Sequence, residues 1–210
     1  MTAHRSLIRR AAAVATAATA AVALAACGGG NDGSAGHDGH GRTSSPSTSA
    51  SAGQGEHNGA DVAFAKGMIP HHRQAVEMAD LAQSRARSAE VRKLAAEIEK
   101  AQDPEIRTLS GWLASWGEEV PEEGRSAGHG EHSMSGMMTP EEMDELEKAS
   151  GTAFDTAFMQ MMIKHHEGAV EMARTEQADG AYQPAKDMAD AIVTSQSAEI
   201  TRMNELLGNN

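Results

Sequence analysis

Apolar side chains between residues 61 and 207 recur three and four residues apart, which is the spacing of one face of an α-helix. The stripe of the first segment consists of Asp61, Phe64, Ala65, Met68, His71, His72, Ala75, Val76, Met78 and Ala79. The stripe of the second segment consists of Val91, Leu94, Ala95, Ile98, Gln102, Glu105, Ile106, Leu109, Leu113 and Trp116. The pattern predicts two amphipathic helices whose apolar faces pack together.

This pair of segments occurs twice, at a constant offset of 94 residues. Residues 61–79 and 155–173 are identical at 12 of 19 aligned positions. The register continues without a gap, so that Ile98, Gln102, Glu105 and Ile106 fall on Ile192, Gln196, Glu199 and Ile200. Self-similarity at a fixed period indicates a repeated structural unit. We therefore expect two homologous helical hairpins, repeat 1 over 61–117 and repeat 2 over 155–207.

The connection between the repeats divides into a polar loop and a short helix. Residues 118–138 are rich in Gly, Glu, His and Met and predict a loop. Thr139, Pro140 and Glu142 form the signature of a helix start, with a capping Thr, Pro in the first turn and Glu three residues after the Thr. A short helix over 139–149 follows. The fold predicted for 61–210 is all-α, a four-helix bundle with one extra short helix.

The N-terminal residues predict export and a lipid anchor. Arg5, Arg9 and Arg10 precede an Ala-rich apolar run, the layout of a signal peptide over 1–26. The run ends in Leu-Ala-Ala-Cys27-Gly, which resembles the bacterial lipobox, in which the Cys carries the lipid. Residues 27–60 are Gly-, Ser- and Thr-rich and read as a disordered linker with scattered His. The predicted location is the outer face of the cytoplasmic membrane.

Composition narrows the class of ligand. The formal net charge of -12 argues against a nucleic-acid partner, because binding phosphates needs a basic face. The single Cys excludes Cys-based zinc and iron-sulfur sites. Aromatic residues make up only 3%, whereas the chain has 13 Met and 10 His. Thioether and imidazole ligands together suit copper, as Cu(I) or Cu(II), better than a hard cation.

The candidate metal ligands lie on the repeated stripes. Both repeats place a Met three residues before a His-His pair and another Met six residues after it, on one helical face. These ligands are Met68, His71, His72, Met78, Met162, His165, His166 and Met172. The alternative is that the Met side chains fill the core and the His side chains are merely hydrogen-bonded there. The sequence leaves open one shared site or two, and leaves homo-oligomers open.

Polar residues on the second helical segment of each repeat are candidates to hydrogen-bond the metal ligands from behind. Gln102, Glu105, Gln196 and Glu199 would be costly to bury unpaired, and hydrogen bonds to the imidazoles would satisfy them. Asp61 and Asp155 are candidates of the same kind. A purely structural polar network is the equal alternative, and direct ligation by the Glu pair is less favoured.

The loop offers a second candidate metal site. Its ligands would be His129, His132, Met134, Met137 and Met138. Met residues in a Gly- and Ser-rich loop have no core to fill, which favours metal capture. The alternative is a loop that folds back hydrophobically.

No recognisable catalytic constellation accompanies these ligands. The chain has no Gly-x-Ser-x-Gly elbow and no Glu-x-x-His motif of di-iron bundles. The sequence predicts a copper-binding protein for buffering, sequestration or resistance, without turnover. The first alternative is a helical bundle of the cell envelope that binds no metal and has a structural or protein-binding role. The second alternative is a cuprous oxidase.

The repeated motifs resemble one known family. Met-Ile-Pro-His71-His72-x-x-Ala-Val-Glu-Met-Ala, its counterpart around His165 and His166, Gly-x-x-Phe154-Asp155 and the Gln-x-x-Glu-Ile pairs are similar to domain of unknown function 305 over residues 60 to 207. The resemblance implies an exported, ferritin-like helical bundle, with some members acting as periplasmic copper-binding proteins in copper resistance. Carried over by position, it implies the same His and Met ligands.

Overall fold

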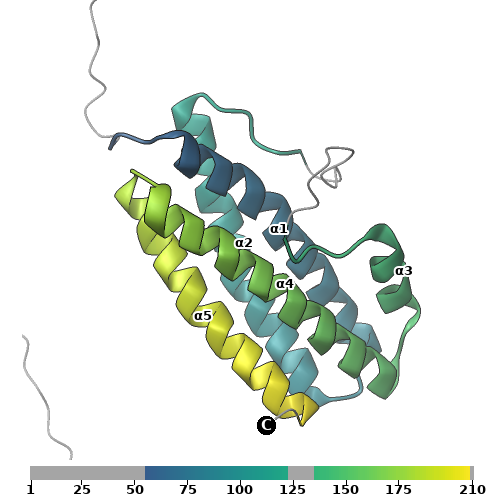
Figure 1. Cartoon of the computed structure of the whole chain (residues 1–210). Helices are drawn as coiled ribbons and strands as arrows, with labels where there is room; N and C mark the ends of the chain where they lie inside the picture. The colour runs from purple at the N-terminus through teal and green to yellow at the C-terminus, as the bar shows by residue number, and fades with distance from the viewer. Residues whose placement is uncertain (1–54, 123–134, 209–210) are drawn as a thin grey trace, which may run out of the picture. The chain divides into compact units, whose positions relative to one another are not determined.

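The computed structural model describes residues 55–122 and 135–208, which form five helices (Figure 1). The signal peptide, Cys27, most of the linker, and His129, His132 and Met134 lie outside the described residues. No described helix is long and apolar enough to cross a membrane. The helices are α1 (Gly59–Arg85), α2 (Ala89–Trp116), α3 (Pro140–Lys148), α4 (Gly151–Asp179) and α5 (Gln183–Leu207).

The helix boundaries follow from local capping. Asn58 caps α1 through its side chain and forms a capping box with Asp61, so α1 begins two residues before the repeat. Thr139 and Glu142 form the capping box predicted for α3. Gly117 ends α2 in a left-handed conformation with φ of 76°, which glycine adopts without steric cost. Pro70 and Pro104 lie inside α1 and α2, which remain single helices.

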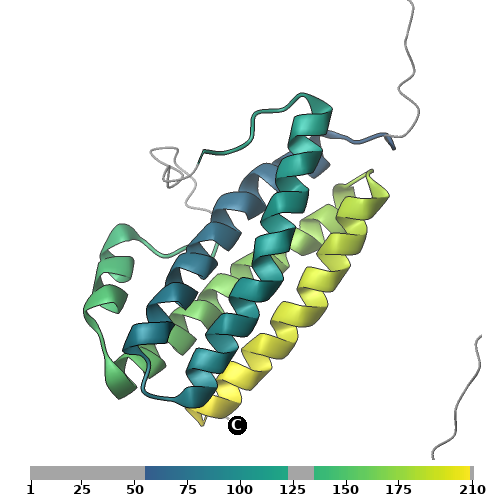
Figure 2. The same cartoon turned by 180° about the vertical axis from the view of Figure 1, so that it is seen from behind.

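The two repeats form two antiparallel hairpins, α1 with α2 and α4 with α5, joined mainly through α1 and α4 (Figures 1 and 2). The short α3 lies beside α1 and α4. The predicted all-α bundle is therefore confirmed. Residues of the first hairpin correspond to residues 94 positions later in the second hairpin, so each site residue on one hairpin has a counterpart on the other.

Asp61 and Asp155 fasten the ends of the two hairpins to each other. Asp61 accepts hydrogen bonds from the backbone N–H groups of Ala181 and Tyr182, at 3.1 and 2.9 Å, in the turn between α4 and α5. Asp155 accepts from the backbone N–H groups of Arg87 and Ser88, at 3.0 and 2.9 Å, in the turn between α1 and α2. These aspartates therefore hold turns at opposite ends of the bundle, which fits the structural polar network that the sequence left open beside a layer around the metal.

The apolar core falls into two halves separated by a polar layer. The first half combines the C-terminal part of α1 with the N-terminal part of α4 and contains Phe154 and Phe158. The second combines the N-terminal part of α1 with the C-terminal part of α4 and contains Phe64 and Ile69. The layer between them holds the His pairs of α1 and α4 and the Gln/Glu pairs of α2 and α5. We call these residues the His layer: His71, His72, Gln102, Glu105, His165, His166, Gln196 and Glu199.

Glu176 is a buried acid beside Asp61, and its counterpart in repeat 1 is Ala82. Burial, and then the neighbouring Asp61 carboxylate, raises the pKa of Glu176 to about 8. Burial also opposes ionisation of Asp61, but hydrogen bonds from the backbone N–H groups of Asn58, Ala181 and Tyr182 outweigh it and lower the Asp61 pKa. Glu176 is therefore protonated at neutral pH next to an ionised Asp61.

Replacing Glu176 with Gln is expected to flatten the pH dependence of stability. The unfolded chain releases this proton near its ordinary pKa of 4.5, whereas the folded protein keeps it up to about pH 8. The stability contribution is thus present below pH 4.5 and lost as pH rises through 8. Urea unfolding of both proteins at about pH 5 and about pH 9 measures the difference. An equal loss of unfolding free energy in the two proteins would contradict the assignment.

Candidate metal centre

Two helices supply four imidazoles to the centre of the bundle. His71 and His72 lie on α1, His165 and His166 lie on α4, and all four are buried. The spacing of adjacent pairs on facing helices makes this convergence possible, because α1 and α4 cross at the same level in opposite directions. The rings of His71 and His165 are in contact, with centroids 3.8 Å apart and planes tilted by 42°.

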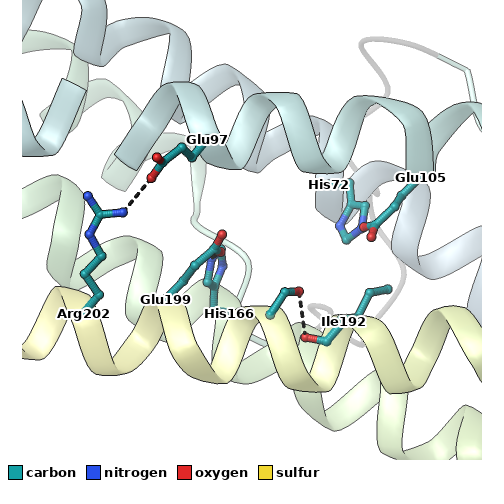
Figure 3. Close-up of polar contacts among 8 residues, drawn as sticks. His72, Glu97, Glu105, His166, Ile192, Glu199 and Arg202 are labelled. Carbon is teal, nitrogen blue, oxygen red and sulfur yellow. Dashed lines mark hydrogen bonds and ion pairs between the residues drawn. The ribbon is translucent and has the colours of Figure 1, made fainter. Parts of the chain in front are cut away.

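The outer helices hold one imidazole each through a carboxylate. His72 Nε2 lies 2.7 Å from Glu105 Oε2 on α2, and His166 Nε2 lies 2.6 Å from Glu199 Oε2 on α5. Figure 3 shows the His72–Glu105 pair and the His166–Glu199 pair between these helices, at different points along them. An ionised carboxylate accepts a hydrogen bond, so Nε2 of each ring carries the proton. The Glu pair therefore contacts one imidazole on each inner helix, which fits both a layer that orients metal ligands and a purely structural polar network.

The interior of the layer contains polar atoms without hydrogen-bond partners among the described residues. Native interiors satisfy most buried polar atoms, so this concentration at one level indicates a place for water or an ion. Gln102 and Gln196 contribute their side-chain oxygens on the same helical face as the Glu pair. The atoms in the layer are Nδ1 of His71, His72, His165 and His166, Nε2 of His165, and Oε1 of Gln102 and Gln196.

Burial keeps the inner imidazoles neutral. Desolvation, followed by repulsion from His72, lowers the pKa of His71 to about 3, against an ordinary value of 6.5. Desolvation, and after it repulsion from His71 and His166, lowers the pKa of His165 well below its usual value. Neutral nitrogens are the form that binds metal. As pH falls below 6.5 the unfolded chain protonates first, so this contribution to stability is lost as pH falls toward 3.

The predicted methionine ligands pack in the apolar core on both sides of the layer. Met68 and Met172 belong to the half that contains Ile69, and Met78 and Met162 belong to the other half. The side chains of Met68, Met78 and Met162 are fully buried, whereas that of Met172 is half-buried. Their positions favour the interpretation that thioethers fill the core. No group of three or more His, Cys, Asp or Glu side chains in the described ranges stands in a metal-binding arrangement.

The described end of the connecting loop is packed rather than open. Met138 is 5% exposed and belongs to the core, and Met137 is half-buried. Gln74 holds the Met138 backbone through two hydrogen bonds, of 2.9 and 2.7 Å. For Met138 this supports the alternative in which the loop folds back hydrophobically. The other ligands of that second site, His129, His132 and Met134, fall in the part of the loop that the structure does not describe.

One contact of the layer was not predicted. The backbone carbonyl oxygen of Ser135 lies 3.2 Å from His71 Nε2. A backbone carbonyl is present at every residue, so the pattern of side chains cannot predict this acceptor. In the repeat, Gly168 aligns with Gln74, which is one of seven differences between residues 61–79 and 155–173.

Comparison with known proteins agrees with this architecture. The family model of a domain of unknown function (DUF305) matches residues 61–207. A DUF305 protein from Streptomyces coelicolor, described as secreted, is 34% identical, with 71% of this chain and 91% of that chain covered and a TM-score of 0.64. A DUF305 fragment from Deinococcus radiodurans is 28% identical, with 73% and 98% covered and a TM-score of 0.63.

A third solved structure carries a metal. CopM in its Cu(I)-bound form is 32% identical, with 71% of this chain and 96% of that chain covered and a TM-score of 0.60. CopM has also been solved in Cu(II)-bound and Ag-bound forms. No curated protein matches this chain.

Proposed function

The chain belongs to the DUF305 family, and on that premise we propose that it is an exported copper-binding protein whose His layer holds the metal. The observation that carries the proposal is the group of buried imidazole nitrogens, between α1 and α4, that have no hydrogen-bond partner among the described residues. The similarity to CopM, solved with Cu(I) and Cu(II), supports copper as the metal.

The residues of the layer suit copper in both oxidation states. Imidazole binds Cu(I) and Cu(II), and His71, His72, His165 and His166 would be the ligands. The Gln102 and Gln196 side-chain oxygens are available beside them. The rings of His71 and His165 lie in mutual contact, which places imidazoles of α1 and α4 side by side. Met68, Met78, Met162 and Met172 flank the layer and offer thioethers only where the core rearranges.

The cellular role follows from the predicted N-terminus. A lipid at Cys27 and a linker over 27–60 would hold the bundle outside the cytoplasmic membrane, where copper arrives from the medium. Metal held by buried nitrogens inside a helical bundle suits buffering, sequestration or resistance. No step of turnover is proposed.

Removing the carboxylates behind the imidazoles should weaken binding without abolishing it. Glu105→Gln combined with Glu199→Gln removes the two charged acceptors that fix the ring orientation of His72 and His166. Loss of such partners typically lowers metal affinity about 10- to 100-fold. Glu97→Gln is the matched control, because Glu97 also lies on α2 and pairs with Arg202 at 2.6 Å, outside the His layer (Figure 3). Equal affinities of the double variant and the control would contradict the role of the Glu pair.

Competition for Cu(I) tests the proposed function as a whole. The protein lacking residues 1–27 is titrated with Cu(I) in the presence of a chromophoric chelator, and we expect it to withdraw copper from the chelator. Failure to compete would reject the proposal and leave the metal-free interaction bundle as the better interpretation. Oxygen consumption above the protein-free rate on Cu(I) addition would instead favour a cuprous oxidase.

A further inference from the structure

The segment from Ser135 to Met138 crosses the contact between α1 and α4 at the level of the His layer. At its C-terminal end, the Gln74 side chain on α1 donates to the Met138 carbonyl and accepts from the Met138 N–H. At its N-terminal end, Ser135 Oγ donates to Glu171 Oε2 on α4 at 2.7 Å. Both ends of the segment are thus attached to the two helices that carry the imidazoles.

Glycine allows the backbone of this segment to lie directly on α4. A Cβ atom added to Gly168 would overlap the Ser135 carbonyl and also meet Gly136 Cα, at 2.9 Å. Gly136 has φ of 80°, and a Cβ there would lie 2.5 Å from the Lys164 carbonyl. Glycine at both positions is therefore required for the close approach. The repeat emphasises this asymmetry, because Gly168 has Gln74 as its counterpart on α1.

The close approach brings a main-chain acceptor to one imidazole. The Ser135 carbonyl oxygen lies 3.2 Å from His71 Nε2. A carbonyl can only accept, so this hydrogen bond requires the proton on Nε2 and leaves Nδ1 with its lone pair. His72 and His166 have the same arrangement, with Glu105 and Glu199 as acceptors. The Nδ1 atom of His71 is buried and has no partner among the described residues, and the same holds for Nδ1 of His72 and His166.

We propose that the Ser135 carbonyl orients His71 for metal binding through Nδ1, and that Gln74 and Gly168 are the positioning residues that seat this carbonyl. The inference rests on the proposed function, because it assigns the ligand atom of His71 at that same site. Metal-binding histidines commonly donate their second ring N–H to a carboxylate or a backbone carbonyl. The segment between the two repeats thus supplies a hydrogen-bond acceptor to His71, as Glu105 and Glu199 do to His72 and His166.

The tautomer of His71 in the metal-free protein gives a direct test. Long-range ¹H–¹⁵N spectra of the full chain, labelled at histidine, distinguish a proton on Nε2 from one on Nδ1. We expect His71 to carry it on Nε2 in the unchanged protein. Gly168→Ala should displace the Ser135 carbonyl and change the His71 tautomer population, while His72 and His166 keep theirs. Gly111→Ala is the matched control, because a Cβ there meets nothing within 4 Å.

Copper affinity gives the second readout. We expect Gly168→Ala to lower Cu(I) affinity about 10-fold, the lower end of the range for lost partners of metal-bound histidines. Gln74→Ala keeps the test decisive if Gly168→Ala fails to fold, because it removes both hydrogen bonds to Met138 without adding bulk. The Gln74 variant should shift the tautomer and the affinity in the same directions.

The outcomes separate this inference from the proposed function. A proton on Nδ1 of His71 in the unchanged protein would overturn the inference whatever the copper result. A changed tautomer with unchanged copper affinity would overturn it while the proposed function stands. A protein that shows the Nε2 tautomer but binds no copper would overturn the proposed function and, with it, the metal-binding part of the inference.

Discussion

Replacing His72 and His166 together with alanine is expected to lower the Cu(I) affinity of the protein by about 100-fold or more, beyond the effect of losing their carboxylate partners. These two rings are buried and each is fixed by a carboxylate on an outer helix, and the Nδ1 atom of each has no partner among the described residues. Alanine removes both the ligand nitrogens and their orientation. Competition with a chromophoric Cu(I) chelator measures the loss.

The control for this prediction is His57→Ala. His57 is an exposed imidazole that stacks on Trp116, with centroids 4.5 Å apart, outside the His layer. Its replacement should leave copper affinity unchanged. Helix content by circular dichroism verifies that each variant is folded before its affinity is compared. A folded His72/His166 double variant with the affinity of the His57 variant would remove these two residues from the site.

Asp61→Ala is expected to destabilise the protein by about 2 to 4 kcal/mol while leaving the copper affinity of the folded protein unchanged. The Asp61 carboxylate is buried and accepts from the backbone N–H groups of Asn58, Ala181 and Tyr182. Alanine would strand these donors at the point where the N-terminus of α1 meets the α4–α5 turn. Urea unfolding near pH 7 measures the change in free energy.

Asp80→Ala is the matched control on the same helix, because Asp80 is exposed. It should change the unfolding free energy by no more than about 0.5 kcal/mol. If Asp61→Ala were equally mild, the fastening of the two hairpins through this carboxylate would be wrong. If it lowered copper affinity strongly in the folded state, Asp61 would belong with the metal site after all.

The fold could be read from the sequence because two independent patterns agreed. Helical periodicity marked each amphipathic segment, and the offset of 94 residues showed that the segments form two equivalent hairpins. The exact start of α1 was less predictable, because Asn58 caps it from within a stretch that reads as linker. A cap depends on one side chain at the helix end, so the periodicity of the apolar residues does not reveal it.

The candidate site was only partly predictable for a physical reason. His71, His72, His165 and His166 lie on repeated stripes, so their convergence follows once α1 faces α4. The function of Asp61 and Asp155 did not follow, since a polar residue on an apolar stripe can serve a metal or a turn equally well. The Ser135 carbonyl belongs to the main chain, and the Gly168/Gln74 difference that accompanies it is one of seven between the aligned motifs, so the sequence did not predict the contact.

Thioether ligation stays a prediction, because a buried Met on these helices can fill the core or bind a metal. Abundant Met beside His indicated thioether ligation, yet Met68, Met78 and Met162 occupy the two apolar halves, where their flexible side chains fill space. Nitrogen ligands from four imidazoles therefore carry the proposed site, with the thioethers as neighbours. Copper as the metal now rests on the imidazole layer and on similarity to CopM, rather than on the number of methionines.

The measurement that tests the central claim most directly is a crystal structure of the copper-loaded protein with anomalous scattering recorded at the copper edge. The account predicts an anomalous peak inside the His layer, between α1 and α4, bonded to imidazole nitrogens that include Nδ1 of His72 and His166. A peak bonded only to residues outside this layer, with the four imidazoles in their present contacts, would contradict it.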